Sequence, residues 1–151
     1  MLKIKYLPQY FLALLMVLLI LLEGWTYYLG RPAPTFKRYL GESVPAVVTD
    51  LSLRRYKAAH SPHLFSIKVA PENEQALIAK LTQMCKMEKI TPAEIPVELT
   101  KVDDEMVAVI KESPWIYLTK AYDVSDPFHH RLCLLFRDKD TIYLFLYGDL
   151  E

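Results

Sequence analysis

Glycine and cysteine are scarce in this sequence, and neither sign of charge is in excess. Only four glycines occur among 151 residues, and no glycine-rich phosphate loop or GxSxG nucleophile motif is present. Two cysteines are too few for a disulfide framework. Lysine and arginine together number 18, as do aspartate and glutamate, so the formal net charge is zero. This balance predicts that nucleic acid is not a partner.

The charges are nevertheless unevenly placed along the chain. Residues 1–45 carry five basic and two acidic side chains, a net charge of +3. Residues 46–151 carry 13 basic and 16 acidic side chains, a net charge of −3. The basic part surrounds an apolar stretch, and the mildly acidic part forms the body of the protein.

The apolar stretch runs from Phe11 to Leu22 without a polar side chain, a length of 12 residues. A bilayer core about 30 Å thick needs roughly 20 residues, so this run alone resembles the core of a signal peptide. Aromatic residues on both sides, of the kind that favour the membrane interface, extend the segment to residues 7–29. Residues 7–29 are long enough to span a membrane.

Small residues in an A-x-A-like cleavage pattern do not follow the apolar core. We therefore predict that residues 1–29 form a retained membrane anchor, an uncleaved signal-anchor. The alternative is an exported soluble protein from which a signal has been cleaved. Lys3 and Lys5 lie close to the near end of the anchor, and Arg31, Lys37 and Arg38 follow its far end, so the difference in positive charge is small. Because the short basic N-terminal side also resembles the n-region of an export signal, we expect the N-terminus in the cytoplasm and the body outside the cytoplasmic membrane.

Residues 30–45 read as a linker between the anchor and the body, because prolines stiffen this segment and glycines interrupt helices. The residues concerned are Pro32, Pro34, Pro45, Gly30 and Gly41. The body, residues 46–151, has 106 residues, which is enough for one hydrophobic core.

The body shows strand-like and helix-like patterns in turn. Residues 47–54 and 63–70 alternate apolar and polar side chains, which predicts a β-hairpin. Residues 71–89 follow with an apolar stripe at helical spacing, opened by a proline and closed by lysines. Two further apolar runs, joined by the polar sequence RDKD at 137–140, predict a second hairpin.

Residues 97–122 are ambiguous, and short helices are the favoured interpretation, with Asp103, Asp104 and Glu105 opening one and Ser113 capping another. The predicted fold class is α+β: an N-terminal transmembrane helix followed by a small domain with an antiparallel sheet (ββα…ββ) packed on one main helix. Both faces of the last strand, residues 141–147, are apolar, so we expect that strand to be covered on each side.

The four histidines form two pairs that suggest, but do not match, a metal site. His60 and His63 flank Pro62, which breaks any helix that would present them together, and His129 and His130 are adjacent. Neither pair has the ligand spacing of a known zinc site. We predict no metal and no cofactor, and the alternative is a small-ligand or metal-binding sensor.

The two cysteines have a structural interpretation. Cys85 lies on the predicted helix stripe and Cys133 in a strand, so both are expected to be buried apolar residues. If the body is exported, the two are candidates for a disulfide.

Aromatic residues with nearby arginine, a combination enriched at interfaces, are the best remaining indication of function. They are expected to share one face of the sheet. Two interpretations stand: a helix from residues 97–122 covers them, with Trp115 and Tyr117 available for that, or they form a partner surface. The residues are Arg54, Tyr56, Tyr143, Phe145 and Tyr147.

From these patterns we predict a single-pass, membrane-anchored, non-enzymatic protein-interaction module. Its partners would be the membrane, through residues 7–29, and an unidentified protein.

Overall fold

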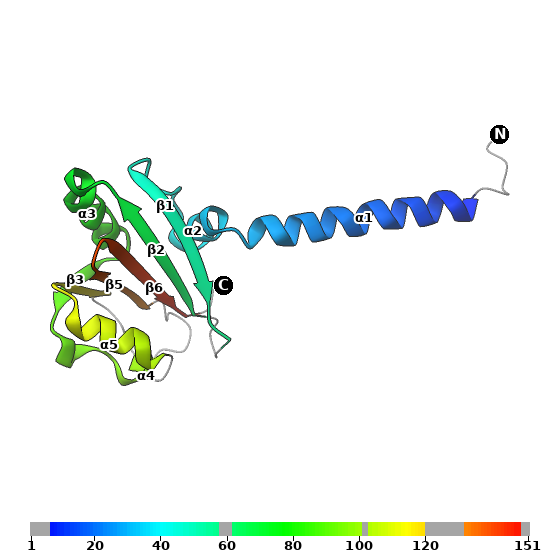
Figure 1. The fold of residues 1–151 in the computed structure, drawn as a ribbon. Coiled ribbons are helices and arrows are strands. Elements are labelled where there is room, and N and C mark those ends of the chain that lie inside the picture. The colour runs from blue at the N-terminus through cyan, green and yellow to red at the C-terminus, as the bar shows by residue number, and fades with distance from the viewer. Residues whose placement is uncertain (1–6, 58–61, 101–102, 120–131, 149–151) are drawn as a thin grey trace.

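The computed structural model describes residues 7–57, 62–100, 103–119 and 132–148. A long helix, α1 (Leu7–Leu29), leads into a domain built on one sheet, and it projects away from that domain (Figure 1). The fold is α+β with an antiparallel sheet, as the sequence predicted.

Six strands form the sheet in the order β1-β2-β6-β5-β4-β3, and every neighbouring pair is antiparallel. Both predicted hairpins are confirmed as β1–β2 and β5–β6. Two short strands were not expected, and they extend the sheet beyond β5. The strands are β1 (Val48–Arg55), β2 (His63–Val69), β3 (Met87–Ile90), β4 (Ile116–Thr119), β5 (Leu132–Asp138) and β6 (Thr141–Tyr147).

Helices cover both faces of the sheet, so packing on one main helix was wrong. On one face lie α2 (Pro32–Leu40) and α3 (Glu74–Met84), and on the other α4 (Val97–Thr100) and α5 (Asp104–Glu112) (Figure 1). Two 3-10 turns, η2 (Pro71–Asn73) and η3 (Pro92–Glu94), complete the elements. The central strands are apolar on both sides, and each side needs a cover to exclude water.

Strand β6 shows this two-sided burial directly. Ile142, Leu144 and Leu146 point into the cluster beneath α2 and α3, whereas Phe145 points into the cluster beneath α4 and α5. The expectation that the last strand is covered on each side is confirmed.

The predicted helix over residues 71–89 was too long at its end. Helix α3 ends at Met84, and Lys86 takes a left-handed φ of 49°, which an α-helix cannot contain. Lys89 then lies in β3, not in a last helical turn. Ser113 likewise ends α5 and leads into β4, so the helix expected to start there was wrong.

Residues 30–45 contain a helix of the domain, so the linker interpretation was wrong for α2. Pro32 and Pro34 lie in the first turn of α2, where a missing N–H costs nothing, and Gly41 ends the helix at φ 77°. Phe36 is only 1% exposed and meets Phe65 of β2 edge to face, with ring centroids 5.5 Å apart.

A side chain of the sheet forms hydrogen bonds at the joint between α1 and α2. Nη2 of Arg55, at the end of β1, donates to the carbonyl oxygen of Gly30 at 3.0 Å and to Oγ1 of Thr35 at 3.4 Å. A guanidinium at the C-terminal end of α1 is also favoured by the helix dipole. The apolar helix and the domain therefore share a defined junction.

Candidate functional site

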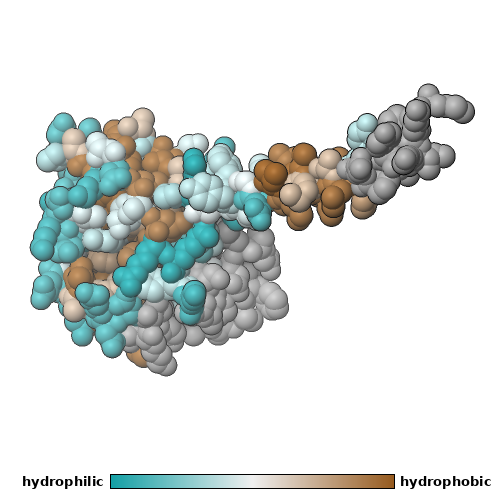
Figure 2. Space-filling view, turned by 45° about the vertical axis from the view of Figure 1, so that its right-hand side comes forward, coloured by the Kyte–Doolittle hydropathy of each residue, from teal (hydrophilic) through white to brown (hydrophobic). Residues whose placement is uncertain are grey.

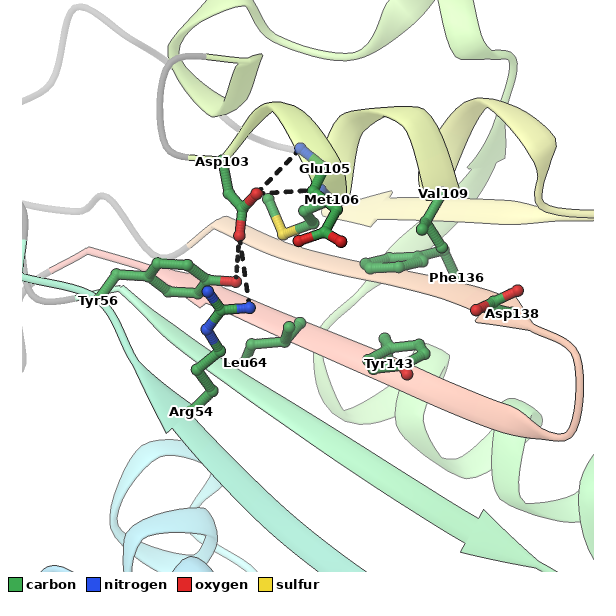
Figure 3. A pocket seen from close by; sticks show the side chains of 10 residues that line it. All are labelled: Arg54, Tyr56, Leu64, Asp103, Glu105, Met106, Val109, Phe136, Asp138 and Tyr143. Carbon is green, nitrogen blue, oxygen red and sulfur yellow. Dashed lines mark hydrogen bonds and ion pairs between the residues drawn. The ribbon is translucent and has the colours of Figure 1, made fainter.

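An open hollow of about 280 Å³ lies on the α5 face, between α5 and the sheet (Figure 3). Strands β1, β2, β5 and β6 contribute its floor and one wall, and α5 contributes the other wall. The lining residues are Arg54, Tyr56, Leu64, Asp103, Glu105, Met106, Val109, Phe136, Asp138 and Tyr143.

One end of the hollow is closed by a polar contact between β1 and α5, which we call the latch: Arg54, Tyr56 and Asp103. The Tyr56 hydroxyl donates to Oδ2 of Asp103 at 3.0 Å, and Nη1 of Arg54 lies 3.6 Å from the same oxygen. The Arg54 guanidinium also lies over the Tyr56 ring, 4.9 Å from its centroid. Figure 3 shows these three side chains converging.

The other oxygen of Asp103 caps helix α5. Oδ1 accepts from the backbone N–H of Glu105 at 3.0 Å and from that of Met106 at 3.2 Å, as an N-cap side chain does. The sequence predicted that Asp103 opens a helix, and this is confirmed. Its contact with Tyr56, 47 residues earlier, has no local signal in the sequence.

The latch shifts the pKa values of both its acidic members. Burial alone would raise the pKa of Asp103, but the Met106 amide, the Tyr56 hydroxyl, the Glu105 amide and Arg54 together hold that pKa below its usual range. Burial, the hydrogen bond to Asp103 and its negative charge raise the pKa of Tyr56 to about 12. Near neutral pH, the latch is therefore an ionised carboxylate held by a neutral phenol.

The aromatic rings and Asp138 make up the other end of the hollow, and Glu105 lies between that end and the latch (Figure 3). The rings of Phe136 and Tyr143 stack at 5.3 Å between centroids and 13° between planes. Tyr143 is half-buried, whereas Phe136 is buried beneath it. Glu105 on α5 and Asp138 at the end of β5 supply carboxylates at the rim.

The predicted aromatic face exists, and it is partly core and partly accessible. Phe145 is fully buried in the cluster with Met106 and Ile110 of α5, which favours the interpretation that a helix covers this face. Tyr56 and Tyr143 remain half-buried and line the hollow, and Tyr147 stacks near Phe145 at 6.5 Å between centroids.

Trp115 and Tyr117 do not cover this aromatic face, contrary to expectation. Both pack against the opposite cluster, beneath α2 and α3. Tyr117 lies in β4, and its neighbours Ile116 and Leu118 point to the α5 side instead. Strand alternation explains the difference, because a strand sends successive side chains to opposite faces.

Of the four histidines, only His63 lies in the described residues; His60, His129 and His130 lie outside them. His63 is buried in β2, with Nε2 3.4 Å from the Tyr39 hydroxyl and ring centroids 4.5 Å apart. Within the described ranges, no group of three or more potential ligands is placed to hold a metal ion. The histidine metal site thus stays untested.

Cys85 and Cys133 are both buried in the cluster beneath α2 and α3, as the sequence predicted. The structure holds both as thiols. Whether they pair after export remains a prediction.

Helix α1 is the second candidate functional feature. Its 23 residues include a stretch from Tyr10 to Tyr28 in which every side chain is exposed. In the described part of the chain, the large exposed apolar side chains all belong to α1, apart from Val97. Figure 2 shows the middle of this helix as apolar, in contrast to the mixed surface of the domain. By length and composition, α1 can cross a membrane.

No protein-family model matches the chain, and no curated protein or solved structure matches it at a significant level. Its function is therefore inferred from its own residues and geometry.

Proposed function

We propose that α1 holds this protein in a cytoplasmic membrane as a single-pass anchor and that the α+β domain binds a protein partner on the outer side. The exposure of α1 is the observation that carries this proposal. Its 23 residues give a length of about 34 Å, against a bilayer core of about 30 Å. An apolar surface of this size is rare on a soluble monomer, which typically exposes patches of a few hundred Å².

The proposed orientation, with the N-terminus in the cytoplasm, rests on Lys3 and Lys5 before α1. Basic residues also follow α1, and Arg31 lies over the Tyr27 ring at 5.2 Å, an arrangement suited to the membrane interface. The difference in positive charge between the two ends is therefore small.

The contacts at the α1–α2 joint support a role in presenting the domain to a partner. Arg55 ties the end of α1 to β1, and α2 packs onto the core directly afterwards. The domain would thus stand close to the membrane surface, where a partner in the same membrane is within reach.

The chemistry of the latch supports a role in structure or binding and not in proton transfer. A general acid or base works best with a pKa near the operating pH. The pKa of Tyr56 is raised to about 12, and the pKa of Asp103 is lowered while both its oxygens accept hydrogen bonds. Neither group of the latch is poised to exchange a proton at neutral pH.

Membrane fractionation of the native protein tests the anchor. We expect the chain to remain with membranes after an alkaline wash, with an intact N-terminus, and the domain to be protected from protease in inside-out vesicles. Replacing Leu15 and Leu18 by lysine should release the protein from the membrane. Each lysine at the centre of a membrane-spanning helix raises the free energy of insertion by about 3 kcal/mol. Replacing the exposed residues Gln75 and Ala79 of α3 by lysine is the matched control, and it should not release the protein from the membrane.

A soluble product beginning after Leu22 would refute the anchor. Digestion of the domain in inside-out vesicles would show that the orientation is opposite to the proposed one.

A further inference from the structure

The charges around the hollow are unbalanced, although those of the whole chain are not. One cation, Arg54, and three carboxylates, Asp103, Glu105 and Asp138, line it, for a net formal charge of −2. Arg54 and Asp103 face each other in the latch. In the described residues, Glu105 and Asp138 are in no salt bridge.

The size of the hollow restricts what it can hold. Pockets for drug-sized molecules generally have volumes of about 300–1,000 Å³, and this one, at about 280 Å³ and open to solvent, lies just below that range. A single long side chain with its backbone outside the hollow is a better fit than a whole metabolite.

The floor and the rim of the hollow favour the same kind of ligand, a cation on an aliphatic stem. The half-buried Tyr143 ring, stacked on Phe136, offers an aromatic surface to a cation. Leu64 and Met106 offer apolar surface to an aliphatic stem. Glu105 and Asp138 offer carboxylates to the charged end, and Figure 3 shows them on the α5 and β5 sides of the Tyr143 ring. The latch already demonstrates a guanidinium lying over a tyrosine ring beside a carboxylate.

We propose that the hollow receives an arginine or lysine side chain of a protein partner. The side chain lies across Tyr143 with its charged group between Glu105 and Asp138, and its stem contacts Leu64 and Met106. This inference rests on the proposed function and specifies the chemistry of the partner at the contact.

Methionine methyl groups provide a direct readout in the full-length protein. The chain has five methionines, of which Met106 lines the hollow, while Met84 and Met87 pack on the opposite face. The protein, labelled with ¹³C-methyl methionine in neutral-lipid nanodiscs, is titrated with N-acetyl-arginine amide. N-acetyl-citrulline amide, which has nearly the same shape and no charge, is the matched ligand.

We expect a saturable shift of the Met106 methyl resonance with the arginine probe and none at Met84 or Met87. The citrulline probe should reach half-saturation only at a concentration at least about fivefold higher, because it lacks both the cation–π contact and the ionic contact. The double variant Glu105→Gln/Asp138→Asn should remove this preference. The control Asp50→Asn/Glu72→Gln removes two exposed carboxylates away from the hollow and should retain it.

Equal response to the two probes, or an unchanged preference in the double variant, would overturn the inference. Saturation by N-acetyl-glutamate amide in place of the arginine probe would also overturn it and assign the hollow to an anion through Arg54. A partner that crosslinks equally well to the wild type and to the Glu105→Gln/Asp138→Asn variant would overturn the cationic contact while leaving partner binding intact.

Discussion

The face of the sheet beneath α2 and α3, the closed face, is filled at its centre by apolar side chains. The face beneath α4 and α5, the open face, leaves a hollow bordered by polar groups between α5 and the sheet. On the closed face, Phe36, Leu77 and Leu81 are each no more than 1% exposed. On the open face, a buried cluster is also present, but the latch and two carboxylates stand at its margin. The comparison indicates that apolar packing dominates the closed face, whereas the open face combines a buried cluster with accessible polar groups.

Removing the α2 contact should produce the largest effect on stability. Phe36→Ala leaves a cavity in the closed face against Phe65, and we expect the free energy of unfolding to fall by about 3–5 kcal/mol. Urea unfolding of the full chain in micelles, followed by Trp115 fluorescence in a Trp25→Phe background, measures it. A loss below about 0.5 kcal/mol, typical of surface changes, would show that α2 is a linker and not part of the packed domain.

A cavity under α3 should have a similar or slightly smaller effect. Leu81 is fully buried, so Leu81→Ala should lower the free energy of unfolding by about 2–5 kcal/mol. Gln83→Ala, on the exposed side of the same helix, is the control and should change it by less than about 0.5 kcal/mol. Similar losses for both variants would show that the closed face is wrongly assigned.

Changes in the latch should have smaller effects, because capping contributes less than core packing. Asp103→Ala removes the cap of α5 and the Tyr56 contact, and we expect a loss of about 1–2 kcal/mol. Asp103→Asn keeps a side-chain oxygen for the cap, so its loss should be smaller. If Asp103→Asn lowers the free energy of unfolding as much as Asp103→Ala does, then the charge of Asp103, and not its cap, stabilises α5.

The pH dependence should separate the latch from the closed face. The pKa of Asp103 is lowered in the folded state, so its stabilisation is present above the unfolded value near 4 and is lost as pH falls through the folded pKa. The pKa of Tyr56 is raised to about 12, so its contribution is present below about 10 and is lost as pH rises towards 12. The Tyr56→Phe variant should show less alkaline destabilisation than wild type, whereas Leu81→Ala should keep the wild-type slope.

Long strands and helix caps could be predicted from the sequence, whereas the short strands could not. The alternation of apolar and polar residues in β1 and β2, the apolar run of β6 and the Asp103 cap of α5 are all evident in the sequence. Strands β3 and β4 have four residues each, too few to establish a period.

The hollow depends on contacts between distant parts of the chain. Tyr56 and Asp103 meet because α5 packs on the face of the sheet to which Tyr56 points, and nothing in the sequence near either residue indicates this contact. The shared face of Tyr56, Tyr143 and Phe145 was nevertheless predicted, because strand alternation fixes it.

Site-specific photocrosslinking in the native membrane tests the central claim most directly. p-Benzoylphenylalanine is placed at Val109, in the hollow, or at Ala79, exposed on α3 across the sheet. We expect one discrete crosslinked protein from position 109 that is absent from position 79 and is diminished in the Glu105→Gln/Asp138→Asn background. The same products from both positions, or none from position 109 in a folded, membrane-bound protein, would contradict the central claim.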